Sequence, residues 1–293
     1  MKRPLFTGAA TAIVTPFLDQ NVDLAAFERL LWRQLDAGIS AIVVTGTTGE
    51  ASTLRLEEKE ALWRLAAATA QNDAVVIAGV GTNHTAQSVA LAKAAAGCGV
   101  DALLAVTPYY NKATQEGLYQ HYIAIAEATS LPLILYNVPS RTGVALAPET
   151  CRRLSLHPKI AGLKEASGDL SALAKIRRLC GGELPVWCGN DDQTVAAMSL
   201  GAYGVISVLS NVRPRLVKTM CDRALTGDFA EAARLQLAAL PLIEALFSEV
   251  NPIPVKAALA AEGLCRDELR LPLTPMSAEK RPALLSALAA CPA

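Results

Sequence analysis

The stretch KIAGLKEASGD, Lys159 to Asp169, contains the features that decide the fold. An apolar run that begins at Ile160 leads into Lys164, and a polar, glycine-containing segment follows. Continuous rather than alternating apolar residues are typical of a strand that is buried on both faces, as in a parallel sheet. The sequence therefore predicts a buried strand that ends at an amine.

Similar short runs recur along the whole chain. They alternate with amphipathic helical patterns, and this alternation indicates βα units and a parallel sheet. The strand candidates are residues 8–15, 40–45, 74–80, 101–106, 131–138, 160–164, 184–189 and 203–208. The helical patterns between them include residues 24–38, 56–70, 85–99 and 115–130. Because a closed (β/α)8 barrel of the TIM type needs roughly 250 residues, eight such units predict this fold.

The strand signals stop after the helical pattern LTGDFAEAARLQLAALPLIEALFSE, residues 225–249, and the remainder reads as helices. We therefore expect a (β/α)8 barrel with the active site at residues 1–225 and a C-terminal helical domain at residues 226–293. The alternative architecture is an open, doubly wound sheet. It is disfavoured because no G-x-G-x-x-G motif follows the first strand, as a dinucleotide-binding fold would prefer.

Composition and charge narrow the class of function. The 293 residues are 52% hydrophobic and 18% charged, and their formal net charge is zero. Such a composition is typical of a globular core. The chain has no basic tract that would bind nucleic acid or an anionic membrane surface, so we expect small-molecule chemistry.

Targeting segments, disulfides and metal sites are not expected. The N-terminus lacks the apolar core of a signal peptide, and no apolar run reaches the roughly 18 residues of a membrane span, which predicts a cytoplasmic protein. The seven cysteines include no C-x-x-C pair and are expected to be reduced. The three histidines are far apart, at positions 84, 121 and 157, which argues against a metal centre.

In a barrel of this type the active site collects at the carboxyl ends of the strands. Lys164 is the leading candidate there, because burial favours the neutral amine, which attacks carbonyl groups to form a Schiff base. The alternative is a lysine that reaches from a strand end to solvent or pairs with Glu165.

Two other strand ends offer groups that suit such a reaction. Tyr136 ends the preceding strand and could move protons, and Arg141 in the following loop has the planar fork that binds a carboxylate. Thr47 and Thr48 lie in the turn TGTTGE, whose flanking glycines allow backbone N–H groups to face an anion. Taken singly, each has an ordinary explanation as an anchored aromatic, a surface charge or a common turn.

The motif TPYYN adds two adjacent tyrosines, Tyr109 and Tyr110. They alternate in direction if extended and could serve different neighbours, although an aromatic interface patch is an equally simple explanation. Lysine, tyrosine, arginine and an anion-binding turn together describe a pocket for a carbonyl compound that carries a carboxylate.

Several longer motifs, in this order and spacing, resemble the 4-hydroxy-tetrahydrodipicolinate (dihydrodipicolinate) synthase family. This family belongs to the pyruvate-dependent class I aldolase, or N-acetylneuraminate lyase, superfamily. The resemblance covers essentially the whole chain and is carried by GTTGE (46–50), TPYYNKATQEGLYQHY (107–122), LYNVPSRTG (135–143), GLKEASGD (162–169), GVISV (204–208), NPIPVKAAL (251–259) and LRLPLTP (269–275).

The resemblance implies a condensation in lysine and diaminopimelate biosynthesis. Lys164 would form an imine with pyruvate, and the resulting enamine would attack L-aspartate 4-semialdehyde. Tyr136, Thr48 and Tyr110 match the proton-relay triad of the family, in which the tyrosine at the position of Tyr110 comes from a neighbouring subunit. Arg141 matches the residue that receives the carboxylate of the semialdehyde.

The remaining implications concern the pocket and the assembly. Thr47 and Thr48 match the residues that hold the carboxylate of pyruvate, and Gly189 and Ile206 match positions that line the pocket. No cofactor is implied beyond the imine on the lysine. The resemblance implies a homotetramer built as a dimer of dimers.

Two alternatives stay open at the level of sequence. Sialate and sugar-acid lyases of the same superfamily share the lysine, the tyrosine and a similar turn, and Arg141 is the residue that favours the synthase. A catalytically silent paralogue that binds a metabolite is the alternative from another class. Such a paralogue should have lost part of the set, whereas Lys164, Tyr136, Thr48, Tyr110 and Arg141 are all present.

A possible effector site departs from the family pattern. Ser52, Asn83 and Tyr109 fall at positions of the site where many of these synthases bind L-lysine. Leu56 and Lys59 replace histidines there, and Gln87 replaces a carboxylate that would hold the ammonium of the effector. We therefore expect weak or absent inhibition by lysine.

Overall fold

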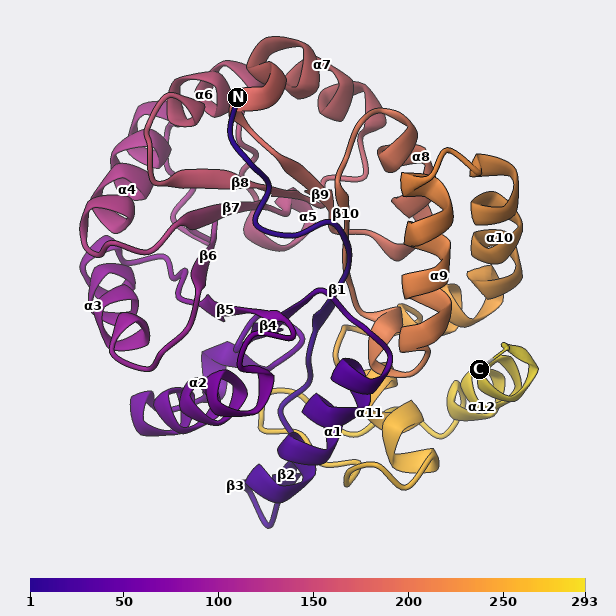
Figure 1. Ribbon diagram of the computed structural model, residues 1–293. Helices are drawn as coiled ribbons and strands as arrows, with labels where there is room; N and C mark the ends of the chain where they lie inside the picture. The colour runs from indigo at the N-terminus through magenta and orange to yellow at the C-terminus, as the bar shows by residue number, and fades with distance from the viewer. Residues whose placement is uncertain (293) are drawn as a thin grey trace.

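The eight predicted strands form one closed barrel (Figure 1). A computed structural model describes residues 1–292. Neighbouring strands are parallel and follow the order β1-β10-β9-β8-β7-β6-β5-β4 around the barrel. The barrel strands are β1 (Gly8–Ala12), β4 (Ala41–Val44), β5 (Val75–Gly79), β6 (Ala102–Val106), β7 (Leu133–Asn137), β8 (Ile160–Glu165), β9 (Val186–Cys188) and β10 (Gly204–Ser207). The predicted (β/α)8 barrel is confirmed, and the alternative of an open, doubly wound sheet is wrong.

Helices between the strands form a ring around the barrel (Figure 1). They are α1 (Leu24–Asp36), α2 (Leu56–Ala70), α3 (Thr85–Ala96), α4 (Gln115–Glu127), α5 (Pro139–Thr142), α6 (Pro148–Ser155), α7 (Leu170–Cys180), α8 (Thr194–Ser199) and α9 (Pro214–Leu225). The side chains of Asp23, Thr114 and Asp169 accept backbone N–H groups at the starts of α1, α4 and α7. Such caps fix where a helix begins. None of the helices found in residues 1–292 is long and apolar enough to cross a membrane.

Several short elements were not predicted. The strands β2 (Phe17–Leu18) and β3 (Asn21–Val22) form a small antiparallel hairpin before α1. Four turns of 3-10 helix lie in loops after barrel strands or helices. They are η1 (Ala51–Thr53), η2 (Gly181–Glu183), η3 (Asp191–Gln193) and η4 (Leu209–Asn211).

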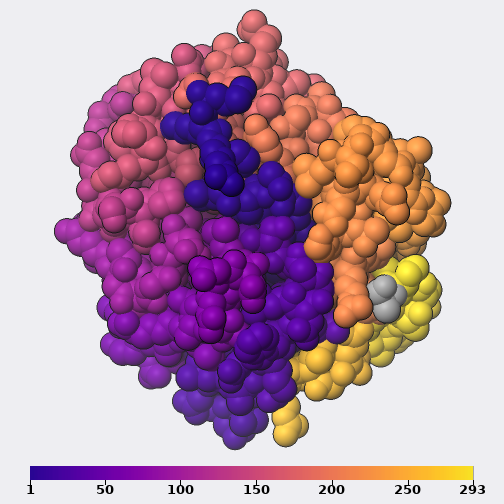
Figure 2. All heavy atoms as spheres, viewed as in Figure 1, coloured from indigo at the N-terminus to yellow at the C-terminus, as the bar shows by residue number. Residues whose placement is uncertain are grey.

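An aromatic stack closes the barrel at the end where the strands begin. The rings of Phe6 and Trp187 are stacked with centroids 4.7 Å apart, and the Trp187 indole donates a hydrogen bond to the Phe6 carbonyl at 3.2 Å. A Cβ atom at Gly162 would lie 2.4 Å from the Trp187 ring, so the stack requires a glycine there. In Figure 2 the first residues, in indigo, lie across the near face of the molecule.

The chain beyond the barrel is helical and packs against one side of it (Figures 1 and 2). It contains α10 (Phe229–Leu246), α11 (Ile253–Ala261) and α12 (Arg281–Ala290), and α10 packs on α9 and α8. The predicted domain boundary at residues 225 and 226 falls at the end of α9. Residue 293, the last of the predicted helical domain, lies outside the described residues, and the division into two domains stays a prediction.

Candidate active site

Lys164 lies near the end of β8 with its side chain directed into the barrel. Successive residues of a strand face opposite sides, so Leu163 packs outward under the helices while Lys164 faces inward. In the pairing of β7 with β8, Tyr136 lies directly beside Lys164. The Lys164 Nζ atom is 4.4 Å from the centroid of the Tyr136 ring, and the two residues are only 6% and 7% exposed. The prediction of a buried amine at this strand end is confirmed.

Glu165 does not neutralise this amine. Its carboxylate accepts hydrogen bonds from the Asn137 side chain at 2.9 Å and from the Ser167 backbone N–H at 2.7 Å. Burial raises the pKa of Glu165, and the hydrogen bonds from Ser167 and Asn137 oppose that shift. Within residues 1–292, Lys164 forms no ion pair, so the alternative in which it pairs with Glu165 is wrong.

Two residues after β9 shape the surroundings of the lysine. A Cβ atom at Gly189 would lie 3.0 Å from Cε of Lys164 and 2.6 Å from the Cβ of Ala166, so Gly189 leaves the room that the lysine occupies. Asp191 is 2% exposed and accepts the backbone N–H groups of Val208 and Leu209, both at 2.9 Å. Burial raises the pKa of Asp191, while these hydrogen bonds and the Lys164 charge act against the rise.

The turn after β4 brings two threonines to the same end of the barrel. Backbone hydrogen bonds from Gly49 to Gly46 and from Glu50 to Thr47, both 3.1 Å, hold the turn. Thr47 faces the cavity described below, whereas Thr48 is 2% exposed. The Thr48 hydroxyl accepts a hydrogen bond of 3.0 Å from the Asn251 side chain.

Asn251 connects this turn to the arginine. Arg141 lies in α5, and its guanidinium donates a 3.2 Å hydrogen bond to the backbone carbonyl of Asn251. One residue of the C-terminal helical part therefore contacts both Thr48 and Arg141. No sequence pattern predicted a role for Asn251, although this residue opens the NPIPV segment, where a polar residue precedes a buried helix.

A cavity of about 300 Å³ lies beside Thr47 and Arg141. Thr47, Tyr136 and Arg141 line one part of it. Ser52, Lys59, Gln87 and Tyr109 also line it, so the residues that the sequence assigned to an effector site share a cavity with the predicted active site. The other two predicted effector residues, Leu56 and Asn83, are not part of the lining among the described residues.

Lys164, Thr48 and Gly189 are not part of this lining, and neither are Ile206 and Tyr110. Ile206 is fully buried inside the barrel as part of β10. Tyr110 is 89% exposed and has a left-handed backbone with a φ of 73°, so its ring projects from the surface rather than into the cavity of its own chain. The structure therefore groups Lys164, Tyr136 and Gly189, and separately joins Thr48 to Arg141 through Asn251.

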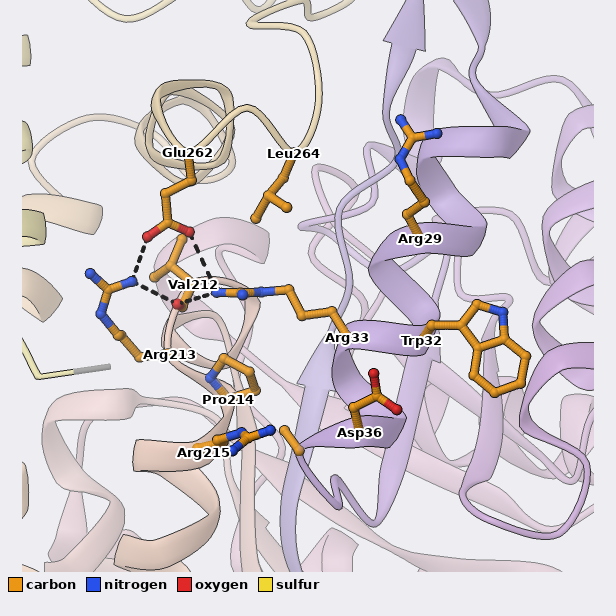
Figure 3. A pocket seen from close by; sticks show the side chains of 11 residues that line it. Arg29, Trp32, Arg33, Asp36, Val212, Arg213, Pro214, Arg215, Glu262 and Leu264 are labelled. Atoms are coloured by element: carbon orange, nitrogen blue, oxygen red, sulfur yellow. Dashed lines mark hydrogen bonds and ion pairs between the residues drawn. The ribbon is translucent and has the colours of Figure 1, made fainter.

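A larger depression, about 940 Å³, lies away from Lys164 between α1, the start of α9 and the segment after α11 (Figure 3). Figure 3 shows Arg33 and Arg213 directed at Glu262. Their shortest distances to its carboxylate oxygens are 3.4 and 2.6 Å. These charges join the barrel to the C-terminal helices. In residues 1–292 no group of three or more His, Cys, Asp or Glu side chains is placed to hold a metal ion.

Comparisons with known proteins bear on the family and the fold of the chain. Residues 5–291 match the model of the dihydrodipicolinate synthetase family. A 4-hydroxy-tetrahydrodipicolinate synthase of Exiguobacterium sp. (strain ATCC BAA-1283 / AT1b) is 50% identical over 285 residues, which cover 97% of each chain. The crystal structure of dihydrodipicolinate synthase from Thermotoga maritima is 42% identical, covers 97% of this chain and 98% of its own, and has a TM-score of 0.95. A monomeric dihydrodipicolinate synthase variant is 43% identical, with 98% and 97% covered and a TM-score of 0.96.

Proposed function

The chain belongs to the dihydrodipicolinate synthetase family, and from this premise we infer what it catalyses and how its residues divide the work. It is an enzyme that condenses pyruvate with L-aspartate 4-semialdehyde to 4-hydroxy-tetrahydrodipicolinate, in L-lysine and diaminopimelate biosynthesis. This is a carbon–oxygen lyase with a class I aldolase mechanism. The observation that carries the proposal is the inward, unpaired amine of Lys164 against Tyr136.

Lys164 is the proposed nucleophile. Its neutral amine attacks the keto carbon of pyruvate, and the carbinolamine loses water to give an imine. Loss of a proton from the pyruvate methyl group converts the imine to an enamine, which forms the new carbon–carbon bond with the aldehyde carbon of the semialdehyde. The amino group of the semialdehyde then attacks the imine carbon, closes the ring and releases Lys164 as a free amine.

Tyr136, Thr48 and Tyr110 are the proposed proton relay. The role of Tyr136 is supported by its contact with Lys164. The role of Thr48 is supported by its buried hydroxyl, which accepts a hydrogen bond from the Asn251 side chain and can donate its own proton to another group. The exposure of Tyr110 favours a role in a second subunit's site. We propose a homotetramer of two dimers for this reason; one solved relative is a monomeric variant.

The two substrate carboxylates have separate proposed partners. Thr47 and Thr48 hold the carboxylate of pyruvate, and Arg141 binds that of the semialdehyde through its planar fork. Gly189 leaves room beside Lys164, and Ile206 lies in the buried cluster that contains Tyr136, so we propose that both border the space around the lysine. The covalent lysine intermediate supplies the electron sink, so we propose a reaction without a bound cofactor.

The relatives' names and Arg141 both favour the synthase over a sialate or sugar-acid lyase. The test is turnover of pyruvate and L-aspartate 4-semialdehyde, coupled to the reductase that consumes the product. We expect activity in the wild type and in Lys175→Ala, an exposed lysine on α7, and none in Lys164→Ala. Absence of turnover in the wild type, together with release of pyruvate from a sugar acid, would contradict the proposal.

A further inference from the structure

One face of α1 carries charges and an indole where it borders the depression of Figure 3. On this side the depression is lined by Arg29, Trp32, Arg33 and Asp36. Their spacing of i, i+3, i+4 and i+7 places these side chains on one face of the helix. The volume of about 940 Å³ lies at the upper end of the range for small-molecule sites, so a ligand of nucleotide size fits there.

The guanidinium groups of this depression outnumber its carboxylates. With Arg213 and Arg215 on the facing wall, at the start of α9, the described lining contains four guanidinium groups. It contains two carboxylates, those of Asp36 and Glu262. Glu262 is shared, because it lies 2.6 Å from Arg213 and 3.4 Å from Arg33. The described lining therefore carries two more positive than negative charges.

Some of these guanidinium groups are free to bind a ligand. Arg213 is fully engaged, because Glu262 and backbone carbonyls accept hydrogen bonds from its nitrogens. Arg29 and Arg215 are exposed and form neither an ion pair nor a hydrogen bond within residues 1–292. Arg33 is only partly engaged, since its buried Nε atom has no acceptor there. Guanidinium groups have the planar donor geometry that matches phosphate oxygens.

Trp32 adds a flat apolar surface to the same depression. It is 47% exposed, whereas Trp63 and Trp187, the other two tryptophans, are fully buried. The indole N–H groups of those two donate to Thr45 and to the Phe6 carbonyl, while that of Trp32 has no acceptor among the described residues. The face of an exposed indole is a surface on which a nucleobase stacks.

We propose that this depression is a binding site for a nucleoside polyphosphate. Arg29, Arg33 and Arg215 hold the phosphate groups, which balance the excess of positive charge. The base stacks on Trp32. The Asp36 carboxylate repels phosphate and accepts a hydrogen bond from a ribose hydroxyl, so it sets the direction in which the nucleotide lies. No described residue lines both this depression and the cavity of the candidate active site, so the site does not depend on the proposed reaction.

The test is titration of the protein with ADP, followed by calorimetry and by tryptophan fluorescence. We expect one ADP per chain and a saturable change in emission that is absent in Trp32→Phe. Arg29→Gln and Arg215→Gln should each bind ADP at least about tenfold more weakly, because each loses charge-assisted hydrogen bonds. Neither arginine has a partner in the described fold, so both variants should fold. Arg178→Gln, at an exposed arginine of α7, should bind as the wild type does.

Two analogues of ADP separate charge from stacking. Pyrophosphate lacks the base, so it should bind at least about fivefold more weakly than ADP and leave the emission of Trp32 unchanged. Adenosine lacks the phosphates and should not bind measurably. Equal affinities for pyrophosphate and ADP would show that the base makes no contact, and this result would overturn the proposal.

Two other results would also overturn it. The first is no ADP binding to the wild type, or equal affinity in the wild type and both arginine variants. The second is loss of ADP binding in Arg141→Gln, because that arginine lines the other cavity and its loss would place the nucleotide there. Turnover is not measured in any of these titrations, so an inactive protein leaves the test of this site intact.

Discussion

Two buried lysines at the same end of the barrel have opposite surroundings. Lys256 is fully buried, lies 2.7 Å from the Glu50 carboxylate and donates to the Thr15 carbonyl at 2.9 Å. Lys164 is 6% exposed, forms no ion pair within residues 1–292, and has its Nζ atom over the face of the Tyr136 ring. An amine with all its partners in place stabilises the fold, whereas an amine without a carboxylate remains available for chemistry. Burial alone would not have distinguished them.

The paired lysine belongs to a network that joins the barrel to the C-terminal helices. Glu50, at the end of the turn TGTTGE, binds Lys256 of α11 and accepts the backbone N–H of Arg270 at 3.2 Å. Arg270 also holds Glu58 of α2 and lowers the pKa of that carboxyl to about 2. The network therefore fixes the turn that carries Thr47 and Thr48.

Removal of the unpaired amine should give the largest effect. Lys164→Met is expected to lower turnover by about a thousandfold or more, because the covalent step has no other nucleophile. The variant should keep at least the wild-type melting temperature, since no ion pair is lost. A thermal scan and the coupled assay check this together. A variant that unfolds would show that Lys164 stabilises the fold as Lys256 does.

Removal of the paired amine should act on stability instead. Lys256→Met leaves Glu50 buried without its cation, and we expect a loss of about 3–5 kcal/mol in the free energy of unfolding. Denaturant unfolding measures it. The double variant Lys256→Met/Glu50→Gln should recover part of the loss. No recovery would mean that packing around Phe17, rather than charge, explains the effect.

A smaller effect on turnover is expected at Asn251, where the C-terminal helical part contacts Thr48. Asn251→Ala removes the donor to Thr48, and we expect kcat to fall about tenfold while the protein remains folded. The matched variant Asn72→Ala, at an exposed position before β5, should leave kcat unchanged. An unchanged kcat in Asn251→Ala would show that Thr48 needs no positioning by the tail.

The lysine-effector prediction concerns a third buried amine. Because Lys59 adds positive charge and Gln87 supplies no carboxylate, L-lysine should inhibit weakly or not at all. An inhibition curve measured at saturating substrate checks this. Half inhibition at submillimolar lysine would refute it.

The smallest effect should be the pH dependence of stability that Lys59 adds. Burial lowers the pKa of its ammonium below the usual 10.5. The folded protein thus binds this proton less tightly than the unfolded chain does. The buried ammonium therefore lowers the free energy of unfolding by its full amount below the folded-state pKa, and this loss disappears as the pH rises to 10.5. The wild type should gain stability relative to Lys59→Met over that range. A difference that is independent of pH, or equal to that of Lys93→Met at an exposed position on α3, would contradict this.

Sequence reasoning predicted what depends on local pattern. Continuous apolar runs located every barrel strand, and the end of one such run placed Lys164 at the carboxyl end of β8. It could not find contacts between distant positions. Glu50 and Lys256 are 206 residues apart, and nothing in either segment indicates the other. The contacts of Asn251 became visible only when loops from separate strands were brought together.

The contact between Asn251 and Thr48 has a consequence for the order of synthesis on the ribosome. Every barrel strand has been made once Ser207 is added, and Lys164 is then already in the nascent chain. Asn251 emerges later, so Thr48 and Arg141 lack their shared neighbour during that interval. The proposed nucleophile is therefore made before the contacts that join Thr48 to Arg141 can form. Those two contacts depend on the last part of the chain.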